Sequence, residues 1–444
     1  MHMRRGGKKA EHISAETAAR LVKSGDWVEY GTTFNQPDVF DAALAARTSE
    51  LKDVKIRSGI SMKPRAVLEA DPSGKHYFWF SWHFSGYDRK KHDAGISHYI
   101  PVNLGEIPDY YRRFIDSVDV AVLKVCPQGA DGYFNFSATG LWHRAIIERA
   151  KIVIVEVNKE LPYCHGVDNG VHVSEVDFMI DGDDAPASEL PNPPLTEVDR
   201  AVGRFIASEI EDGACLQVGI GGMPNAVCAA LLESGVRDLG IHSEMLTDGM
   251  VDLYNSGQVT GARKTLNEGK IVYSFALGSS ALYQTLDRNA DFQCYQVDRT
   301  NPPEIIMQNN CAVAINNTTQ IDLQGQAASE TDGHRHISGT GGQLQFVRGA
   351  YASPGGKSFI CLASTYERGD IRRSRIVLDL TPGNIVTTPR SDVMYVVTEF
   401  GIVNLKGMSV ADRAKALISI AHPDYRESLE REARNNTLIP KGYN

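Results

Sequence analysis

The feature that most constrains the fold is a pattern that occurs twice along the chain. In each copy a helical run ends at adjacent Gly and Asp residues, a strand follows, and a glycine-started loop leads through a proline into a second helix. The first copy has its strand at 27–30 and its proline at Pro37, and the second has them at 215–218 and Pro224. In both, a leucine lies seven residues after the proline. This shared order favours an internal duplication of one α/β unit.

Further strand signals along the chain also indicate an α/β arrangement. Runs of apolar, β-branched residues such as 120–125 and 152–157 alternate with helical segments. Runs of this kind are typical of a parallel sheet that is covered on both faces. The predicted fold class is therefore α/β, with two similar open, mainly parallel sheet domains.

The domain boundary is predicted from a stretch without any regular period. Residues 183–194 are rich in proline and acidic residues, which is typical of a linker. The first nine residues are basic and lack the apolar region of a secretory signal. We predict a disordered basic tail at 1–12, an N-terminal domain at 13–185, a linker at 186–195 and a C-terminal domain at 196–444.

Composition narrows the class of protein. A chain of 444 residues is too long for one ordinary core, and 42% apolar with 23% charged residues is typical of a globular protein. The net charge of −9 argues against nucleic-acid binding. Seven scattered cysteines without a CxxC pair indicate a reducing compartment, and no apolar run is long enough to cross a membrane. We therefore expect a cytoplasmic protein with no nucleic-acid or membrane partner.

A glycine-rich loop at residues 219–224 is the first candidate for ligand binding. It lies between a predicted strand and a helix amino end, where free N–H groups and the helix dipole favour negative charge. Pro224 stands where a dinucleotide fingerprint needs its third glycine, so that motif is absent. The loop is either a tight structural turn or a cradle for a phosphate or an oxyanion.

Glu244 is the candidate nucleophile. It lies in a turn between Gly240 and Gly249, directly after a short strand-like run. The duplication places this turn at the carboxyl edge of a strand next to the glycine loop, which is where α/β proteins bind ligands. Taken by itself, the segment favours the alternative interpretation, a surface glutamate in a loop. A carboxylate can attack a carbonyl that has a good leaving group such as a thioester sulfur, and donors from the glycine loop can stabilise the oxyanion.

Three further segments carry residues that could form a site. Gly341 and Gly342 allow close approach of a ligand, with Gln343 and Arg348 as possible hydrogen-bond donors, although a hairpin or bulge is the alternative. His334 and His336 form an HxH pair without a third ligand at a recognisable spacing, so no metal site is expected. The aromatic run 77–84 is predicted as a strand, with an acyl-pocket wall as the alternative.

These motifs, in order, resemble the acetyl-CoA hydrolase/transferase family of class I CoA-transferases. The resemblance rests on residues 219–224, 242–245, 338–343 and 397–401, and on a C-terminal segment at 421–426. It covers nearly the whole chain from about residue 14. Within the family the sequence looks most like butyryl-CoA:acetate CoA-transferases, followed by 4-hydroxybutyrate CoA-transferases. The resemblance implies two similar α/β domains with the active site between them. It also implies a homo-oligomer, although no feature of the sequence itself indicates one.

The resemblance also implies roles for individual residues. The catalytic glutamate of the family falls on Glu244. The expected CoA contacts are Gly219, Ile220, Gly221, Gly222, Met223, Thr319, Gly341, Gly342 and Arg368, although Thr319 stands where the family has an aliphatic residue and the loop at Arg368 varies in length. Glu399, Asn301 and Gln343 are the expected substrate-side residues.

The activity implied by the resemblance is CoA transfer from butyryl-CoA to acetate by a ping-pong mechanism through a glutamyl-CoA thioester. Acyl-CoA and short-chain carboxylates would be the substrates, with no metal and no cofactor beyond CoA itself. Three alternatives stay open: 4-hydroxybutyrate as the acyl group, hydrolysis of the acyl-CoA by water, and a non-catalytic sensor of CoA or a sugar phosphate. The sequence does not rank the acyl chains, because the side chains of the acyl pocket cannot be placed from it.

Overall fold

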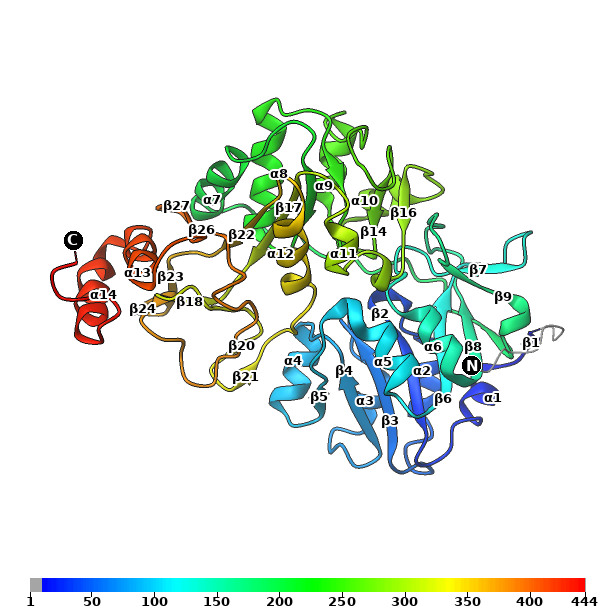
Figure 1. Ribbon diagram of the computed structural model, residues 1–444. Helices are drawn as coiled ribbons and strands as arrows, with labels where there is room; N and C mark the ends of the chain where they lie inside the picture. The colour runs from blue at the N-terminus through cyan, green and yellow to red at the C-terminus, as the bar shows by residue number, and fades with distance from the viewer. Residues whose placement is uncertain (1–9, 444) are drawn as a thin grey trace. The chain divides into compact units, whose positions relative to one another are not determined.

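The computed structural model describes residues 10–443, which divide into two compact units (Figure 1). Within the described chain, unit 1 contains residues 10–190, 272–300 and 336–341, and unit 2 contains 191–271, 301–335 and 342–443. The change of unit after Leu190 falls within the predicted linker 186–195. The return of two later segments to unit 1 was not part of the predicted division, because a linker signal marks only one crossing of the chain.

Most of the predicted N-terminal tail, residues 1–9, lies outside the described residues. Its last part is not a free tail: Glu11–His12 forms strand β1, which pairs in parallel with the edge strand β10 (Phe178–Asp181). Backbone pairing at a sheet edge needs no sequence signature beyond an extended segment. The expectation of disorder up to residue 12 is therefore wrong at residues 11 and 12.

Unit 1 is built on an eight-stranded sheet in which every described pairing is parallel. In spatial order its strands are β1, β10, β8 (Ala150–Val157), β6 (Val118–Val125), β2 (Trp27–Thr32), β3 (Val54–Gly59), β4 (Tyr77–Ser81) and β5 (Ser97–Tyr99). The helices of this unit are α1 (Ala15–Ala19), α2 (Val39–Ala45), α3 (Ala66–Ala70), α4 (Gly86–Asp93), α5 (Ile107–Arg113), α6 (His143–Arg149) and α10 (Ser280–Leu286). Short strands β7 (Tyr133–Asn135), β9 (Gly170–His172), β14 (Ile271–Tyr273), β15 (Phe275–Ala276) and β16 (Phe292–Cys294) complete it.

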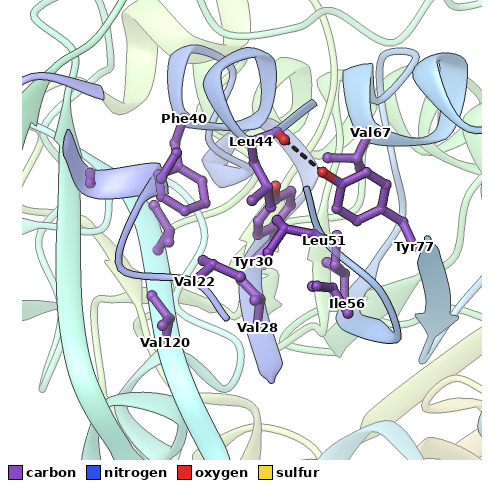
Figure 2. Close-up of a cluster of buried hydrophobic side chains, with 14 of the residues drawn as sticks. Val22, Val28, Tyr30, Phe40, Leu44, Leu51, Ile56, Val67, Tyr77 and Val120 are labelled. Atoms are coloured by element: carbon purple, nitrogen blue, oxygen red, sulfur yellow. Dashed lines mark hydrogen bonds between the residues drawn. The ribbon is translucent and has the colours of Figure 1, made fainter. Parts of the chain in front are cut away.

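One hydrophobic core cluster of unit 1 lies between this sheet and helices α1, α2 and α3 (Figure 2). Tyr30, Phe40 and Leu44 pack there with fully buried side chains, and the Tyr77 hydroxyl donates a 2.6 Å hydrogen bond to the Leu44 carbonyl. Tyr77 and Trp79 belong to the aromatic run predicted as a strand. The strand is confirmed as β4, and these two aromatic side chains contribute to the core.

Unit 2 contains a second sheet of six strands, which are parallel except for the last pair. In spatial order they are β12 (Gly240–Ile241), β11 (Cys215–Val218), β17 (Ala312–Asn317), β22 (Lys357–Cys361), β26 (Tyr395–Thr398) and β27 (Gly401–Asn404). The helices, coloured green to red in Figure 1, are α7 (Glu197–Ala207), α8 (Gly222–Ser234), α9 (Asp248–Asn255), α11 (Pro303–Ile306), α12 (Gln343–Ala352), α13 (Val410–Ser419) and α14 (Pro423–Asn435). The remaining short strands are β13 (Met245–Leu246), β18 (Gln320–Asp322), β19 (Ala327–Ala328), β20 (Thr331–Asp332), β21 (Arg335–His336), β23 (Thr365–Arg368), β24 (Ile371–Ser374) and β25 (Ile376–Val377).

The two sheets share one topology. In unit 1 the spatial order β3–β2–β6–β8–β10 matches β12–β11–β17–β22–β26 in unit 2, and each series visits its strands in the chain order second, first, third, fourth, fifth. The predicted α/β fold with two similar parallel sheets is confirmed. This strand order reverses direction between the first and third strands, and loops at the carboxyl ends of those strands form the usual ligand crevice. In unit 2 the expected crevice position is therefore at the carboxyl ends of β11 and β17.

Candidate active site

The glycine-rich loop of unit 2 lies at this crevice. Strand β11 ends at Val218, and helix α8 begins only four residues later, at Gly222. Gly221 has φ +121°, a conformation that disfavours any side chain at this position. The Asn317 side-chain amide, at the end of β17, donates a 3.1 Å hydrogen bond to the Ile220 carbonyl and so ties the two crevice loops together. The amino end of a 13-residue helix at such a loop favours an anionic ligand group.

In unit 1 the helix that corresponds to α8 is α2, and its amino end is already occupied by a side chain of the protein itself. The Glu156 carboxylate accepts backbone N–H groups from Asp38 (2.8 Å) and Phe40 (2.9 Å) at the start of α2. Lys124 pairs with Asp38 and lies 3.8 Å from Glu156. In unit 2 the Asp199 carboxylate packs against Gly222, but it accepts hydrogen bonds from the N–H and hydroxyl of Thr196. Of the two repeats, unit 2 is thus the one whose loop suits an external anion.

Glu244 follows strand β12 at the same sheet edge as the glycine loop. Strands β11 and β12 are parallel neighbours, so the segments after Val218 and Ile241 leave the sheet side by side. The turn is shaped by the His242 N–H, which donates to the Leu216 carbonyl (3.1 Å), and by the Ser243 hydroxyl, which donates to the Met245 carbonyl (2.6 Å). This places a partly buried glutamate side chain on a short, restrained turn.

Asn301 and Gly342 surround the Glu244 carboxylate. The Asn301 side-chain amide donates a 2.5 Å hydrogen bond to Glu244 Oε2, although 57 residues separate them in the sequence. A Cβ atom added to Gly342 would overlap both Glu244 Oε2 and Asn301 Nδ2. The structure therefore brings together three of the residues expected at the site, and it shows that position 342 must lack a side chain for this arrangement.

The electrostatics of this cluster suit a nucleophilic carboxylate. Burial raises the pKa of Glu244 to about 7, and the hydrogen bond from Asn301 offsets part of that rise. Gly342 is also the N-cap of α12, a ten-residue helix, so the amino end of this helix lies at the carboxylate and favours negative charge there. A carboxylate with a raised pKa is more basic, and hence more nucleophilic, than an ordinary glutamate once it is ionised.

Other predicted site residues have partners of their own. Glu399 accepts hydrogen bonds from the Ser364 N–H (2.9 Å) and hydroxyl (2.6 Å), and the Gln343 amide donates to the Thr388 hydroxyl (3.2 Å). Thr319 follows β17 at the crevice edge, and its hydroxyl donates to the Ala328 carbonyl (2.7 Å). Met223 lies in the first turn of α8, the Gly341 carbonyl accepts the Leu104 N–H (3.0 Å), and Arg368 ends strand β23. Their assignment to CoA or substrate stays a prediction.

Sequence reasoning missed two residues near these features. Glu156 is the carboxylate that fills the helix amino end of unit 1, and Lys264 donates to the carbonyl of Ile241, three residues before Glu244. Comparing the two repeats strand by strand would have directed attention to Glu156, which follows an apolar run near the end of β8. No sequence signal separates Lys264 from an ordinary surface lysine.

Comparison with known proteins identifies the family. The acetyl-CoA hydrolase/transferase N-terminal domain pattern matches residues 5–191, and the C-terminal domain pattern matches residues 278–433. The chain is 44% identical over 423 residues to the butyryl-CoA:acetate CoA-transferase of Anaerostipes caccae, covering 95% of both proteins. It is also 44% identical over 423 residues to the succinyl-CoA:cyclohexane-1-carboxylate CoA transferase of Geobacter metallireducens, covering 95% of this chain and 94% of the relative.

A solved structure of a CoA-transferase is also similar to this chain. The crystal structure of 4-hydroxybutyrate CoA-transferase from Porphyromonas gingivalis matches with a TM-score of 0.77 at 34% identity, covering 96% of this chain and 98% of the other. The two-unit α/β fold is thus that of a CoA-transferase. The chain belongs to the acetyl-CoA hydrolase/transferase family, and within it to the CoA-transferases. Within residues 10–443, no helix has the length and apolar character needed to cross a membrane.

Proposed function

We propose that the protein transfers CoA from butyryl-CoA to acetate, with Glu244 as the covalent carrier of CoA. The observation that carries the covalent role is the cluster of Glu244, Asn301 and Gly342: a partly buried carboxylate with a raised pKa, held by one amide at a helix amino end. The choice of butyryl-CoA and acetate is supported by the 44% identity to a transferase with those substrates. The equal identity to a transferase that acts on a cyclic carboxylate makes acceptor specificity the central experimental question.

The first half-reaction loads the enzyme. A Glu244 carboxylate oxygen attacks the thioester carbonyl of butyryl-CoA, the C–S bond breaks, and CoA leaves as a thiolate. The product on the enzyme is a mixed anhydride between Glu244 and butyrate. The thiolate then attacks the side-chain carbonyl carbon of Glu244 and expels butyrate, which leaves a Glu244–CoA thioester. No net proton transfer is required, so the nucleophile must simply be ionised.

The second half-reaction returns CoA to the new acid. An acetate oxygen attacks the Glu244–CoA thioester and expels CoA thiolate, giving a Glu244–acetyl anhydride. The thiolate then attacks the acetyl carbon, acetyl-CoA forms, and the Glu244 carboxylate is regenerated. The amino end of α12 at Gly342 would stabilise the negative charge that develops on oxygen in each addition step.

CoA itself would be held by the crevice of unit 2. In this proposal the phosphate-bearing part binds at the loop of Gly219, Ile220, Gly221, Gly222 and Met223, with Thr319, Gly341, Gly342 and Arg368 as further contacts. Asn301, Gln343 and Glu399 would face the acyl group and the acid. Binding energy from the distant nucleotide can then be used to lower the barrier at the thioester carbon.

Trapping the intermediate tests the covalent role. The full-length protein is incubated with butyryl-CoA alone and treated with borohydride, and the modified residue is mapped by mass spectrometry. We expect reduction of the Glu244 side chain to the alcohol, loss of activity, and protection when acetate is added first to discharge CoA. Reduction at another residue, or full activity after treatment, refutes the proposal.

A matched pair of variants separates nucleophile loss from a general change of charge. Glu244→Gln should form no covalent adduct and should lose turnover by at least about 10³-fold. Glu304→Gln removes an exposed carboxylate in α11, close in sequence to Asn301, and should leave the rate within about two-fold of wild type. Equal behaviour of the two variants would argue against Glu244 as nucleophile.

Acceptor competition tests the substrate assignment. Acetate, propionate, butyrate, 4-hydroxybutyrate and cyclohexane-1-carboxylate are offered to the isolated enzyme–CoA thioester, and kcat/KM is measured for each. We expect acetate and butyrate to give the highest values. Discharge by water at a comparable rate would instead identify a hydrolase, and a preference for 4-hydroxybutyrate or the cyclic acid would replace the proposed substrate pair.

A further inference from the structure

Lys264 is a buried lysine next to the segment that carries Glu244. Its side chain is only 5% exposed and lies within unit 2. The ammonium donates one hydrogen bond to the carbonyl of Ile241 (2.9 Å) and another to the carbonyl of Lys270 (2.6 Å). Ile241 is the last residue of β12, so this contact is made where the chain leaves the sheet toward Glu244.

The burial of this ammonium is unusual because it lacks a counter-ion. Among the partners of Lys264 in residues 10–443 there is no carboxylate, and the titratable group that faces it is the thiol of Cys215. Burial lowers the pKa of Lys264 to about 8. Removing an ammonium from water without a negative partner is costly, so a shorter or uncharged side chain would be the cheaper solution for packing alone.

Gly240 makes room for the lysine stem. A Cβ atom added at Gly240 would lie 2.5 Å from Lys264 Cγ and 2.9 Å from Cδ. The aliphatic part of Lys264 therefore packs directly against the backbone of β12. Glycine at position 240 and lysine at position 264 form a complementary pair, in which the missing side chain of one accommodates the stem of the other.

The lysine completes the hydrogen bonding of a very short edge strand. Strand β12 has two residues and pairs with β11 on one side only. On its other side, backbone N–H groups of Thr260 and Gly261 donate to Leu239. The Lys264 ammonium continues this row at Ile241. Buried backbone carbonyls require a donor, and here the donor is a side chain.

We propose that Lys264 is a positioning residue for Glu244, which acts by holding the Ile241 carbonyl and thereby the turn of residues 242–244. This inference rests on the proposed role of Glu244 as nucleophile. Glu244 lies only three residues after Ile241, so a shift of the Ile241 backbone is passed on to the Glu244 carboxylate, and a displacement of about 1 Å there is enough to slow the reaction. The effect is geometric: burial and Asn301 are the influences on the Glu244 carboxylate, and Lys264 is not among them.

Lys264→Met tests the inference, because methionine keeps an unbranched stem against Gly240 and removes the ammonium. Single-turnover formation of the Glu244–CoA thioester is measured on the full-length protein with butyryl-CoA. We expect the rate to fall by about 10- to 100-fold, as for a displacement of about 1 Å, while KM for butyryl-CoA stays within about two-fold. The acid limb of the pH–rate profile should not move.

Lys357→Met is the matched control. The Lys357 ammonium also donates to a backbone carbonyl, that of Glu209 (2.8 Å), and lies in unit 2 at the first residue of β22. Its loss should lower the melting temperature without changing the rate of thioester formation. A purely structural role for Lys264 predicts the same behaviour for both variants, and that result overturns the inference.

Gly240→Ala supplies a second test that keeps the ammonium and also serves if Lys264→Met does not fold. The added methyl group displaces the lysine stem, so thioester formation should slow in the same way. A Lys264→Met or Gly240→Ala rate within two-fold of wild type refutes the positioning role and leaves Glu244 chemistry intact. Absence of any Glu244 thioester in the wild-type protein refutes the proposed function itself, so the two failures are distinguishable.

Discussion

Replacing Glu244 by glutamine is expected to make stability less dependent on pH, in addition to abolishing turnover. Burial raises the pKa of this carboxyl from 4.5 to about 7 in the folded protein. The folded state therefore binds the Glu244 proton more tightly than the unfolded state does. Its contribution to stability is fully present below pH 4.5 and is lost as the pH rises through 7, where the carboxylate must be ionised while partly buried.

The size of the effect follows from the shift. A difference of 7 − 4.5 = 2.5 pH units corresponds to about 3 kcal/mol at most. Partial exposure of the side chain reduces this, so we expect about 1 to 3 kcal/mol. Glutamine cannot ionise, so the variant avoids this loss. Glu244→Gln should therefore gain about 1 to 3 kcal/mol relative to wild type between pH 5 and pH 8.

Thermal unfolding at several pH values provides the assay. For a unit of about 200 residues, 1 kcal/mol shifts Tm by about 2 to 4 °C. The difference in Tm between Glu244→Gln and wild type should therefore increase by several degrees from pH 5 to pH 8. Two-unit proteins can unfold in steps, so the comparison uses the transition that contains unit 2.

Glu304→Gln is the control for a general change of charge, because its carboxylate is exposed on α11. Its Tm difference from wild type should be almost constant with pH. If the Glu244→Gln difference is equally constant, or becomes smaller as the pH rises, the carboxylate is not held in the desolvated site described above, and the reasoning is refuted.

Three further predictions concern the surroundings of Glu244 and the counterpart in unit 1. Asn301→Leu removes a hydrogen bond to the ionised carboxylate, worth about 1.5 to 3 kcal/mol, so the acid limb of the kcat/KM profile should shift upward by about one to two pH units. Gly342→Ala should lower activity by at least about 100-fold with little loss of Tm, because its φ of −96° suits alanine while the added Cβ overlaps Glu244; Gly86→Ala, where an added Cβ meets no atom within 4 Å, serves as the comparison. Glu156→Gln replaces one of the two carboxylate oxygens that accept the Asp38 and Phe40 N–H groups by an amide nitrogen, so it should destabilise unit 1 by about 1 to 3 kcal/mol in urea unfolding; a neutral result would show that this buried carboxylate does not hold the start of α2.

Much of the architecture could be predicted because its causes are local. Strand and helix signals, the glycine loop before α8 and the proline that opens α2 depend on backbone conformations of neighbouring residues. The repeat made the shared strand order of the two sheets predictable as well. The interleaving of the two units was not predictable, because residues 272–300 and 336–341 carry no boundary signal and are assigned by contacts with distant strands.

The features of the site also divide into those that the sequence predicts and those that it does not. The position of Glu244 after β12, at the ligand edge of the second sheet, followed from the sequence through the duplication and the resemblance. The hydrogen bond from Asn301, the contact with Gly342 and the support from Lys264 involve residues that lie 57, 98 and 20 positions away along the chain. Such pairings depend on how helices and loops pack on the sheet, and no local pattern encodes them.

The sequence by itself thus determined the fold class, the repeat and the identity of the nucleophile candidate, since each depends on local propensity or on an ordered set of motifs. Only the tertiary structure decided that Glu244 is partly buried with a raised pKa, that Gly342 must lack a side chain, and that the repeat in unit 1 is closed by Glu156. The physical reason is that desolvation and close packing are properties of surroundings assembled from distant parts of the chain.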